Sequence, residues 1–148
     1  MFKEGLMESI IPQIFLHLSE NEKSNFYTSL NIIQTKIDDF VRVFYRHFLQ
    51  TEVKSLFKDV NLEEQYKMFR VSLAIIISYI DNPYLLNKHL KLVVENHKKY
   101  GVRKEHIHSF IESFMLSLYE FIGNDNKEIL DIWDKIINKI MKSFEDQI

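Results

Sequence analysis

The chain has 148 residues, a formal net charge of −2 and no cysteine. Its length suits one domain with a substantial core, and the lack of cysteine excludes disulfides, iron–sulfur clusters and thiolate-bound metals. Lysine and arginine are interspersed with acids, and no run reaches the roughly 20 apolar residues of a membrane span. We therefore expect a soluble, cytoplasmic protein without a signal peptide that does not bind nucleic acid and does not span a membrane.

Glycine and proline are scarce, at 3 and 2 residues, and apolar residues recur at helical spacing along the chain. This pattern favours an all-α fold. The first stripe consists of Met7, Ile10, Ile11, Ile14, Phe15 and Leu18. It predicts a helix within residues 1–18, which we treat as an N-terminal extension to a domain of residues 19–148. Because so large an apolar face is seldom left exposed, we expect it to pack on the domain or to form a homodimer contact.

Helix starts and stops divide the rest of the chain. Four pairs of residues have the form of a helix N-cap with its partner in the first turn: Ser19 with Glu22, Asn61 with Glu64, Asn82 with Pro83, and Asp125 with Glu128. Gly101 and Gly123 are suited to end helices. Residues 71–80 have the composition of a buried strand, but no partner strand is available, so we expect a helix there. In total, seven or eight helices are predicted.

One stripe ends in a histidine. It consists of Leu86, Leu90, Val93 and His97, at spacings of four, three and four residues, which predicts the inner face of a helix. Two interpretations of His97 are open at this point. It is either a core histidine whose nitrogens find hydrogen-bond partners, or a metal ligand that offers a neutral imidazole nitrogen.

The residues around His97 resemble the proximal segment of the globins, in which a histidine followed by Gly-Val four and five residues later binds haem iron. Here that pair is Gly101-Val102. The resemblance extends to roughly residues 20–146, with one short deletion between Phe48 and Val53. It is closest to single-domain bacterial globins related to the flavohaemoglobins, and it also rests on three other segments: Phe44-Tyr45, Leu56-Phe57 and the stretch around Trp133.

This resemblance implies a globin fold of seven to eight helices, with the N-terminal helix as an extra element. It implies haem b as the cofactor, with His97 as the ligand to iron and with Tyr45 and Gln65 facing the bound gas. The other residues that it places around haem are Phe57, Phe69, Val93, Val102, Ile107 and Phe110. Among the remaining histidines, His106 is expected to have a structural role, and four are expected at the surface: His17, His47, His89 and His108.

One departure from the relatives bears on function. Flavohaemoglobin-type globins carry a tyrosine ten residues after the proximal histidine, where this chain has Ile107, and no matching glutamate follows near the C-terminus. Peroxidase-like chemistry is therefore not expected. The resemblance implies reversible binding of dioxygen, nitric oxide and carbon monoxide, for oxygen binding or transport or for nitric oxide scavenging.

Turnover as a nitric oxide dioxygenase would need an external reductase, because the chain has no flavin or NAD-binding domain. Two alternatives remain. One is a haem-based gas sensor that acts through a partner protein or through a dimer contact of residues 1–18. The other is a haem-free interaction module with a globin-like fold.

Overall fold

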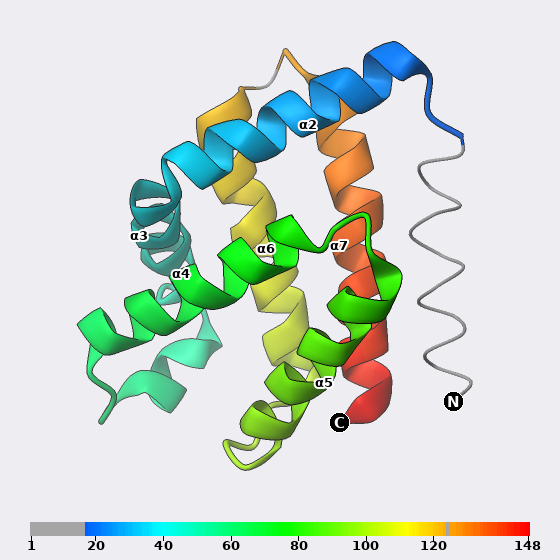
Figure 1. Ribbon diagram of the computed structural model, residues 1–148. Coiled ribbons are helices and arrows are strands. Elements are labelled where there is room, and N and C mark those ends of the chain that lie inside the picture. Colours follow the sequence, from blue (N-terminus) through cyan, green and yellow to red (C-terminus); the bar gives the residue numbers. More distant parts are fainter. Residues whose placement is uncertain (1–16, 124) are drawn as a thin grey trace.

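The computed structural model describes residues 17–123 and 125–148, and these form helices joined by short turns (Figure 1). The all-helical prediction is confirmed for this part of the chain. The extra helix predicted within residues 1–18 lies almost wholly outside the described residues. In chain order the elements are α2 (Glu20–Thr35), α3 (Ile37–Phe48), the 3-10 helix η1 (Glu52–Phe57), α4 (Leu62–Ser78), α5 (Pro83–Lys98), α6 (Lys104–Ile122) and α7 (Lys127–Gln147).

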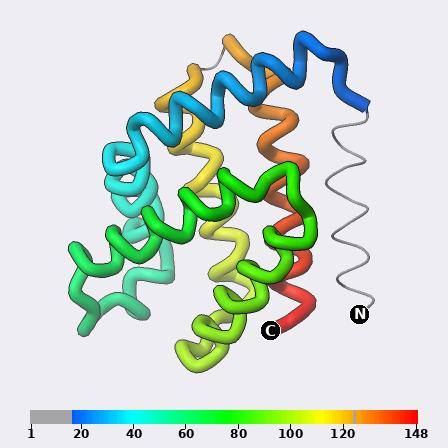
Figure 2. The backbone as a smooth tube through the Cα atoms, in the orientation of Figure 1, coloured from blue at the N-terminus to red at the C-terminus, as the bar shows by residue number. Residues whose placement is uncertain are grey.

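The helices are arranged in two crossing sets (Figures 1 and 2). Helices α6 and α7 lie side by side, and α2 crosses their upper ends in the view shown. Helix α4 passes in front of α6, and α5 turns back from the end of α4, so that α4 and α5 form the two arms of a V. No helix of the described part is both long enough and apolar enough to cross a membrane.

Three of the four predicted caps are confirmed. The Ser19 hydroxyl accepts from the Glu22 amide while the Glu22 carboxylate accepts from the Ser19 amide. The side-chain oxygens of Asn61 and Asn82 each accept a backbone amide three residues later. Such caps satisfy amides that have no partner within the helix, so they fix where α2, α4 and α5 begin.

The fourth predicted cap, Asp125 with Glu128, is wrong. Helix α7 begins at Lys127, and its N-cap residue, Asn126, makes no side-chain capping hydrogen bond. The Asn126 side chain instead donates to the Ile122 carbonyl at 2.8 Å and so serves the end of α6. The two predicted stops are confirmed, because Gly101 and Gly123 have φ angles of +70° and +89°. Glycine adopts these angles without the cost that a Cβ atom would impose.

Aromatic and aliphatic side chains of α2, α3, α6 and α7 form most of the core, and buried residues of α4 and α5 complete it. The Trp133 indole of α7 packs against Phe26 of α2, with ring centroids 5.1 Å apart, and its N–H donates to the Ser29 hydroxyl at 2.9 Å. Phe40 and Phe114 join α3 to α6 by an edge-on ring contact at 5.3 Å. This rigid block supports one side of the V formed by α4 and α5.

Candidate functional site

A cavity of about 650 Å³ opens between α4 and α5 and extends to α3, α6 and α7. Its volume is in the usual range for cofactor and small-molecule sites. Most of its wall is apolar. The wall includes all nine residues that the sequence predicts for the site: Tyr45, Phe57, Gln65, Phe69, Val93, His97, Val102, Ile107 and Phe110.

The predicted stripe of α5 divides into two parts at this cavity. Leu86 and Leu90 are buried, whereas Val93 and His97 are half-buried. Leu90, Val93 and His97 all line the cavity. The C-terminal part of the stripe is therefore only partly covered by other helices and borders the cavity with its remaining surface.

The ring of His97 is held in one tautomer by its own helix. Its Nδ1 lies 2.7 Å from the Val93 carbonyl oxygen. A carbonyl can only accept, so Nδ1 carries the proton, and in the neutral ring the lone pair remains on Nε2. The ring also packs edge-on against Phe144, with centroids 5.7 Å apart. A hydrogen bond from one nitrogen that leaves the other basic is the usual arrangement of a histidine that ligates a metal.

His97 belongs to no cluster of metal-binding side chains among the described residues, which contain no group of three histidines or carboxylates that could hold a metal ion between them. A metal bound here would therefore take its remaining ligands from a non-protein group. A large, mostly apolar ring system that carries its own nitrogen ligands fits both the cavity wall and this donor set, and haem is such a group.

Tyr45 of α3 and Gln65 of α4 form a polar pair in the cavity wall. The Gln65 amide nitrogen donates to the Tyr45 hydroxyl oxygen at 3.2 Å, which leaves the hydroxyl proton free to be donated elsewhere. Tyr45 is buried, and this burial raises the pKa of its hydroxyl to about 12. The hydroxyl therefore stays protonated, and it remains a hydrogen-bond donor, across the whole physiological pH range.

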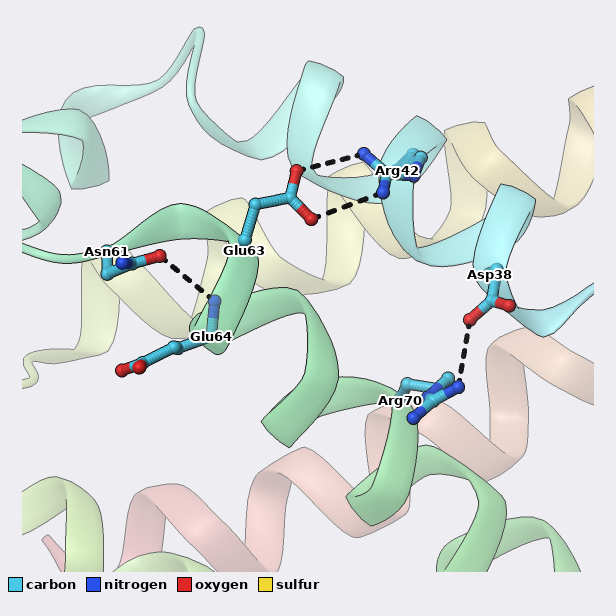
Figure 3. A network of polar contacts seen from close by, with 6 residues as sticks. All are labelled: Asp38, Arg42, Asn61, Glu63, Glu64 and Arg70. Atoms are coloured by element: carbon cyan, nitrogen blue, oxygen red, sulfur yellow. Dashed lines mark hydrogen bonds and ion pairs between the residues drawn. The ribbon is translucent and has the colours of Figure 1, made fainter.

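A surface network holds the first turns of α4 against α3 (Figure 3). Arg42 of α3 makes a two-pronged ion pair with Glu63, with both N–O distances at 3.3 Å, and Asp38 pairs with Arg70 two turns further along α4. Asn61 caps the same end of α4. Gln65 lies between Glu63 and Arg70 in the sequence. The contacts of these two residues with α3 therefore hold in place the turn of α4 that carries Gln65, whose amide donates to Tyr45.

Aromatic contacts continue this network into the cavity wall. The Arg42 guanidinium lies over the Tyr66 ring at 5.4 Å, and the Tyr66 ring packs on Tyr45 at 4.9 Å. The Phe57 and Phe69 rings also contact Tyr45, nearly edge-on, at 5.9 and 5.8 Å. Tyr45 is thus held by several ring contacts and by the hydrogen bond that its hydroxyl accepts from Gln65.

Helix η1 brings Phe57 to the cavity. The Ser109 hydroxyl of α6 donates to the Glu52 carboxylate of η1 at 2.7 Å, and this hydrogen bond lowers the pKa of that carboxylate. This contact holds η1 against α6, and η1 directly follows the short connection in which the resemblance placed a deletion. Phe110, one residue after Ser109, lies in the same wall and contacts Phe69 edge-on at 5.9 Å.

The sequence interpretation was wrong for His89, which was expected at the surface. His89 is half-buried and lies in the cavity wall, where its Nε2 is 3.0 Å from the Ser72 hydroxyl of α4. Burial lowers the pKa of His89. A signal for this position was present, because His89, Val93 and His97 follow one another at intervals of four and so share a helix face.

The other histidines lie as follows. His17 and His108 are exposed, as predicted. His47 is half-buried rather than exposed, with its Nε2 3.4 Å from a Glu120 carboxylate oxygen. His106 is buried in the cavity wall, and its Nδ1 accepts the Arg103 amide at 2.9 Å, which caps the start of α6.

Comparison with known proteins gives one clear result. A family model described as Globin matches residues 41–144, a range that contains all nine predicted site residues. No curated protein matches the chain.

Proposed function

The chain belongs to the globin family, whose members bind haem and diatomic gases, and we propose that it holds haem b in the α4–α5 cavity through His97. Dioxygen, nitric oxide and carbon monoxide are then bound beside Tyr45 and Gln65. Haem b is the form that we propose, and the lack of cysteine supports it by excluding the covalent attachment of c-type haem. When bound, haem supplies an iron atom with one coordination position open to a gas.

The observation that carries this proposal is the position of His97. Its Nδ1 is committed to the Val93 carbonyl, its Nε2 keeps the lone pair, and its ring lies in the wall of a mostly apolar cavity. Tyr45 and Gln65 line the same cavity from α3 and α4 and supply hydrogen-bond donors in surroundings that are otherwise apolar. Donors of this kind stabilise a polar ligand most when water is excluded.

The surroundings of His97 favour reversible gas binding over oxygen activation. Its Nδ1 donates to a neutral backbone carbonyl and not to a carboxylate, which would make the imidazole a stronger electron donor. Ile107 is buried in the wall and has no group that could add to such a relay. Reversible dioxygen binding is therefore the function that we propose, with oxygen transport or nitric oxide scavenging as the physiological use.

The proposal is tested by adding haemin to the purified chain and recording the visible absorption spectrum and the rate of haem loss to an acceptor protein. His97→Ala should change the spectrum and speed haem loss. His89→Ala is the matched control, because it removes a second histidine from the same helix and the same cavity wall. Unaltered haem binding in His97→Ala, or an equal effect of the two substitutions, would overturn the assignment of His97.

A further inference from the structure

The charges of the chain are unevenly divided. Residues 84–104 contain six basic residues and one acid, Glu95, which gives this segment a net charge of +5. Because the whole chain carries −2, the remaining residues carry −7. The even mixing of charges expected from the overall composition therefore does not hold for α5 and the turn that follows it. The basic residues are Lys88, Lys91, Lys98, Lys99, Arg103 and Lys104.

Several of these side chains share the outer side of α5 with exposed apolar groups. At 100° per residue, Tyr84, Lys88, Lys91, Leu92 and Lys99 fall within roughly 100° of one another around the helix. Tyr84, Leu92 and Tyr100 are 65%, 60% and 62% exposed, which is high for such large apolar side chains. We call the surface formed by Tyr84, Lys88, Lys91, Leu92, Lys99 and Tyr100 the α5 face.

The α5 face reaches the cavity. Leu92 is both exposed and part of the cavity wall, and so is Asn96, one turn further along the helix. A molecule bound on this face would lie next to the cavity opening and within a short distance of whatever fills the cavity. The position is thus suited to a partner that must act on the cofactor without entering its pocket.

We propose that the α5 face is the docking surface for an acidic electron-donor protein. This inference rests on the proposed function, since haem iron that has become ferric must regain one electron to bind dioxygen again, and a partner that carries a reducing cofactor can supply it. A reduced flavoprotein gives up one electron and ferric iron becomes ferrous, with no bond formed and no proton transferred. The basic side chains would attract an acidic partner and orient it, and Tyr84, Leu92 and Tyr100 would supply the apolar contacts.

A protein partner fits this face better than a phosphate-rich one. Glu95 lies in the middle of the basic stripe and pairs with Lys98 at 3.0 Å, so a carboxylate stands where phosphates would come closest. Lys99 lies 5.4 Å from the Tyr100 ring, so a cation and an aromatic ring lie next to each other on this face, and tyrosine is among the residues that carry binding energy at protein interfaces. Preferential binding of nucleic acid or of an anionic membrane to this face would therefore contradict the proposal.

The test uses flavodoxin, an acidic flavoprotein, as the probe, and isothermal titration calorimetry at low and at raised salt. The variant Lys88→Glu/Lys91→Glu/Lys99→Glu reverses three charges on the α5 face. Its matched control, Lys127→Glu/Lys135→Glu/Lys139→Glu, makes the same change in charge at exposed positions of α7. Circular dichroism of both variants checks that the helices are kept.

We expect the wild type to bind flavodoxin in a salt-sensitive manner, and the α5 variant to bind at least tenfold more weakly while the α7 variant binds as before. Binding should be the same with and without haem. The inference is overturned by an absence of salt-sensitive binding, by equal losses in the two variants, or by binding of phosphatidylserine vesicles or duplex DNA in preference to flavodoxin. A chain that binds flavodoxin but not haem would refute the proposed function and, with it, the electron-donor role of the partner, whereas one that binds haem and gases but not flavodoxin would refute only this inference.

Discussion

Replacing Tyr45 by phenylalanine should speed the dissociation of dioxygen and leave that of carbon monoxide nearly unchanged. The substitution keeps the ring contacts with Phe57, Phe69 and Tyr66 and removes only the hydroxyl. Dioxygen bound in a globin is polar and accepts hydrogen bonds, whereas carbon monoxide is nearly apolar. A lost hydrogen bond should therefore speed the dissociation of dioxygen alone, whereas a change in the space around the ligand should affect both gases.

The size of the effect follows from the surroundings of the hydroxyl. Tyr45 is only 3% exposed, its hydroxyl is uncharged at neutral pH, and Gln65 occupies its oxygen while leaving its proton free. A hydrogen bond to a ligand that carries partial negative charge contributes about 1.5–3 kcal/mol. Since 1.4 kcal/mol corresponds to a factor of ten, Tyr45→Phe should speed oxygen dissociation about tenfold to a hundredfold.

Stopped-flow dissociation rates of both gases are measured on the wild type, Tyr45→Phe, Gln65→Leu and the double variant. Gln65→Leu should act in the same direction but more weakly, because its amide is already used by the Tyr45 oxygen. The two effects should not add, since the side chains are hydrogen-bonded to each other. Equal changes for dioxygen and carbon monoxide would indicate a steric role, and unchanged rates in Tyr45→Phe would show that the hydroxyl does not face the ligand.

Three further predictions concern stability and titration. Trp133→Phe should lower the free energy of unfolding by roughly 1 kcal/mol or more, measured in urea, because the buried Ser29 hydroxyl loses its donor; an unchanged midpoint would contradict a role for this bond. Arg42→Met should cost no more than about 1 kcal/mol at low salt and almost nothing at high salt, since its pair with Glu63 is exposed and screened; a large, salt-independent loss would show that charge is not the cause. The pKa of Tyr45 is raised in the folded protein, so folding favours its neutral hydroxyl. This contribution to the free energy of unfolding is complete below pH 10 and is lost as pH rises towards about 12. Ultraviolet titration of the wild type and of Tyr45→Phe should differ by one tyrosine that ionises late, and identical titrations would refute the raised pKa.

Much of the fold could be predicted from the sequence because it depends on local chemistry. Caps at Ser19, Asn61 and Asn82 satisfy amides within three residues, and Gly101 and Gly123 take φ angles that other residues avoid. Such signals are contained in a few neighbouring residues. The predicted cap at Asp125 failed because the neighbouring Asn126 side chain serves the preceding helix, and spacing alone does not tell which of two helix ends a side chain will join.

The residues of the site could be predicted from the sequence, but the cavity that they line could not. Helical spacing gives the direction in which a side chain points, and it cannot distinguish a packed core from the wall of a hollow. Leu86, Leu90, Val93 and His97 form one stripe, yet Leu86 is packed in the core while the other three line the cavity. His89 was misplaced for the same reason, because its partner, Ser72, lies on another helix and is reached only when α4 and α5 fold back on each other.

We propose that the Nε2 atom of His97 holds the iron of haem, and chemical rescue is the sharpest test of this assignment. In His97→Gly the side chain is gone and a gap is left in the cavity wall, which free imidazole can enter from solution. We expect that haem added to His97→Gly gives an altered visible spectrum, that millimolar imidazole restores the wild-type spectrum and slow haem loss, and that His89→Gly needs no rescue. A His97→Gly protein with a wild-type spectrum in the absence of imidazole would contradict it.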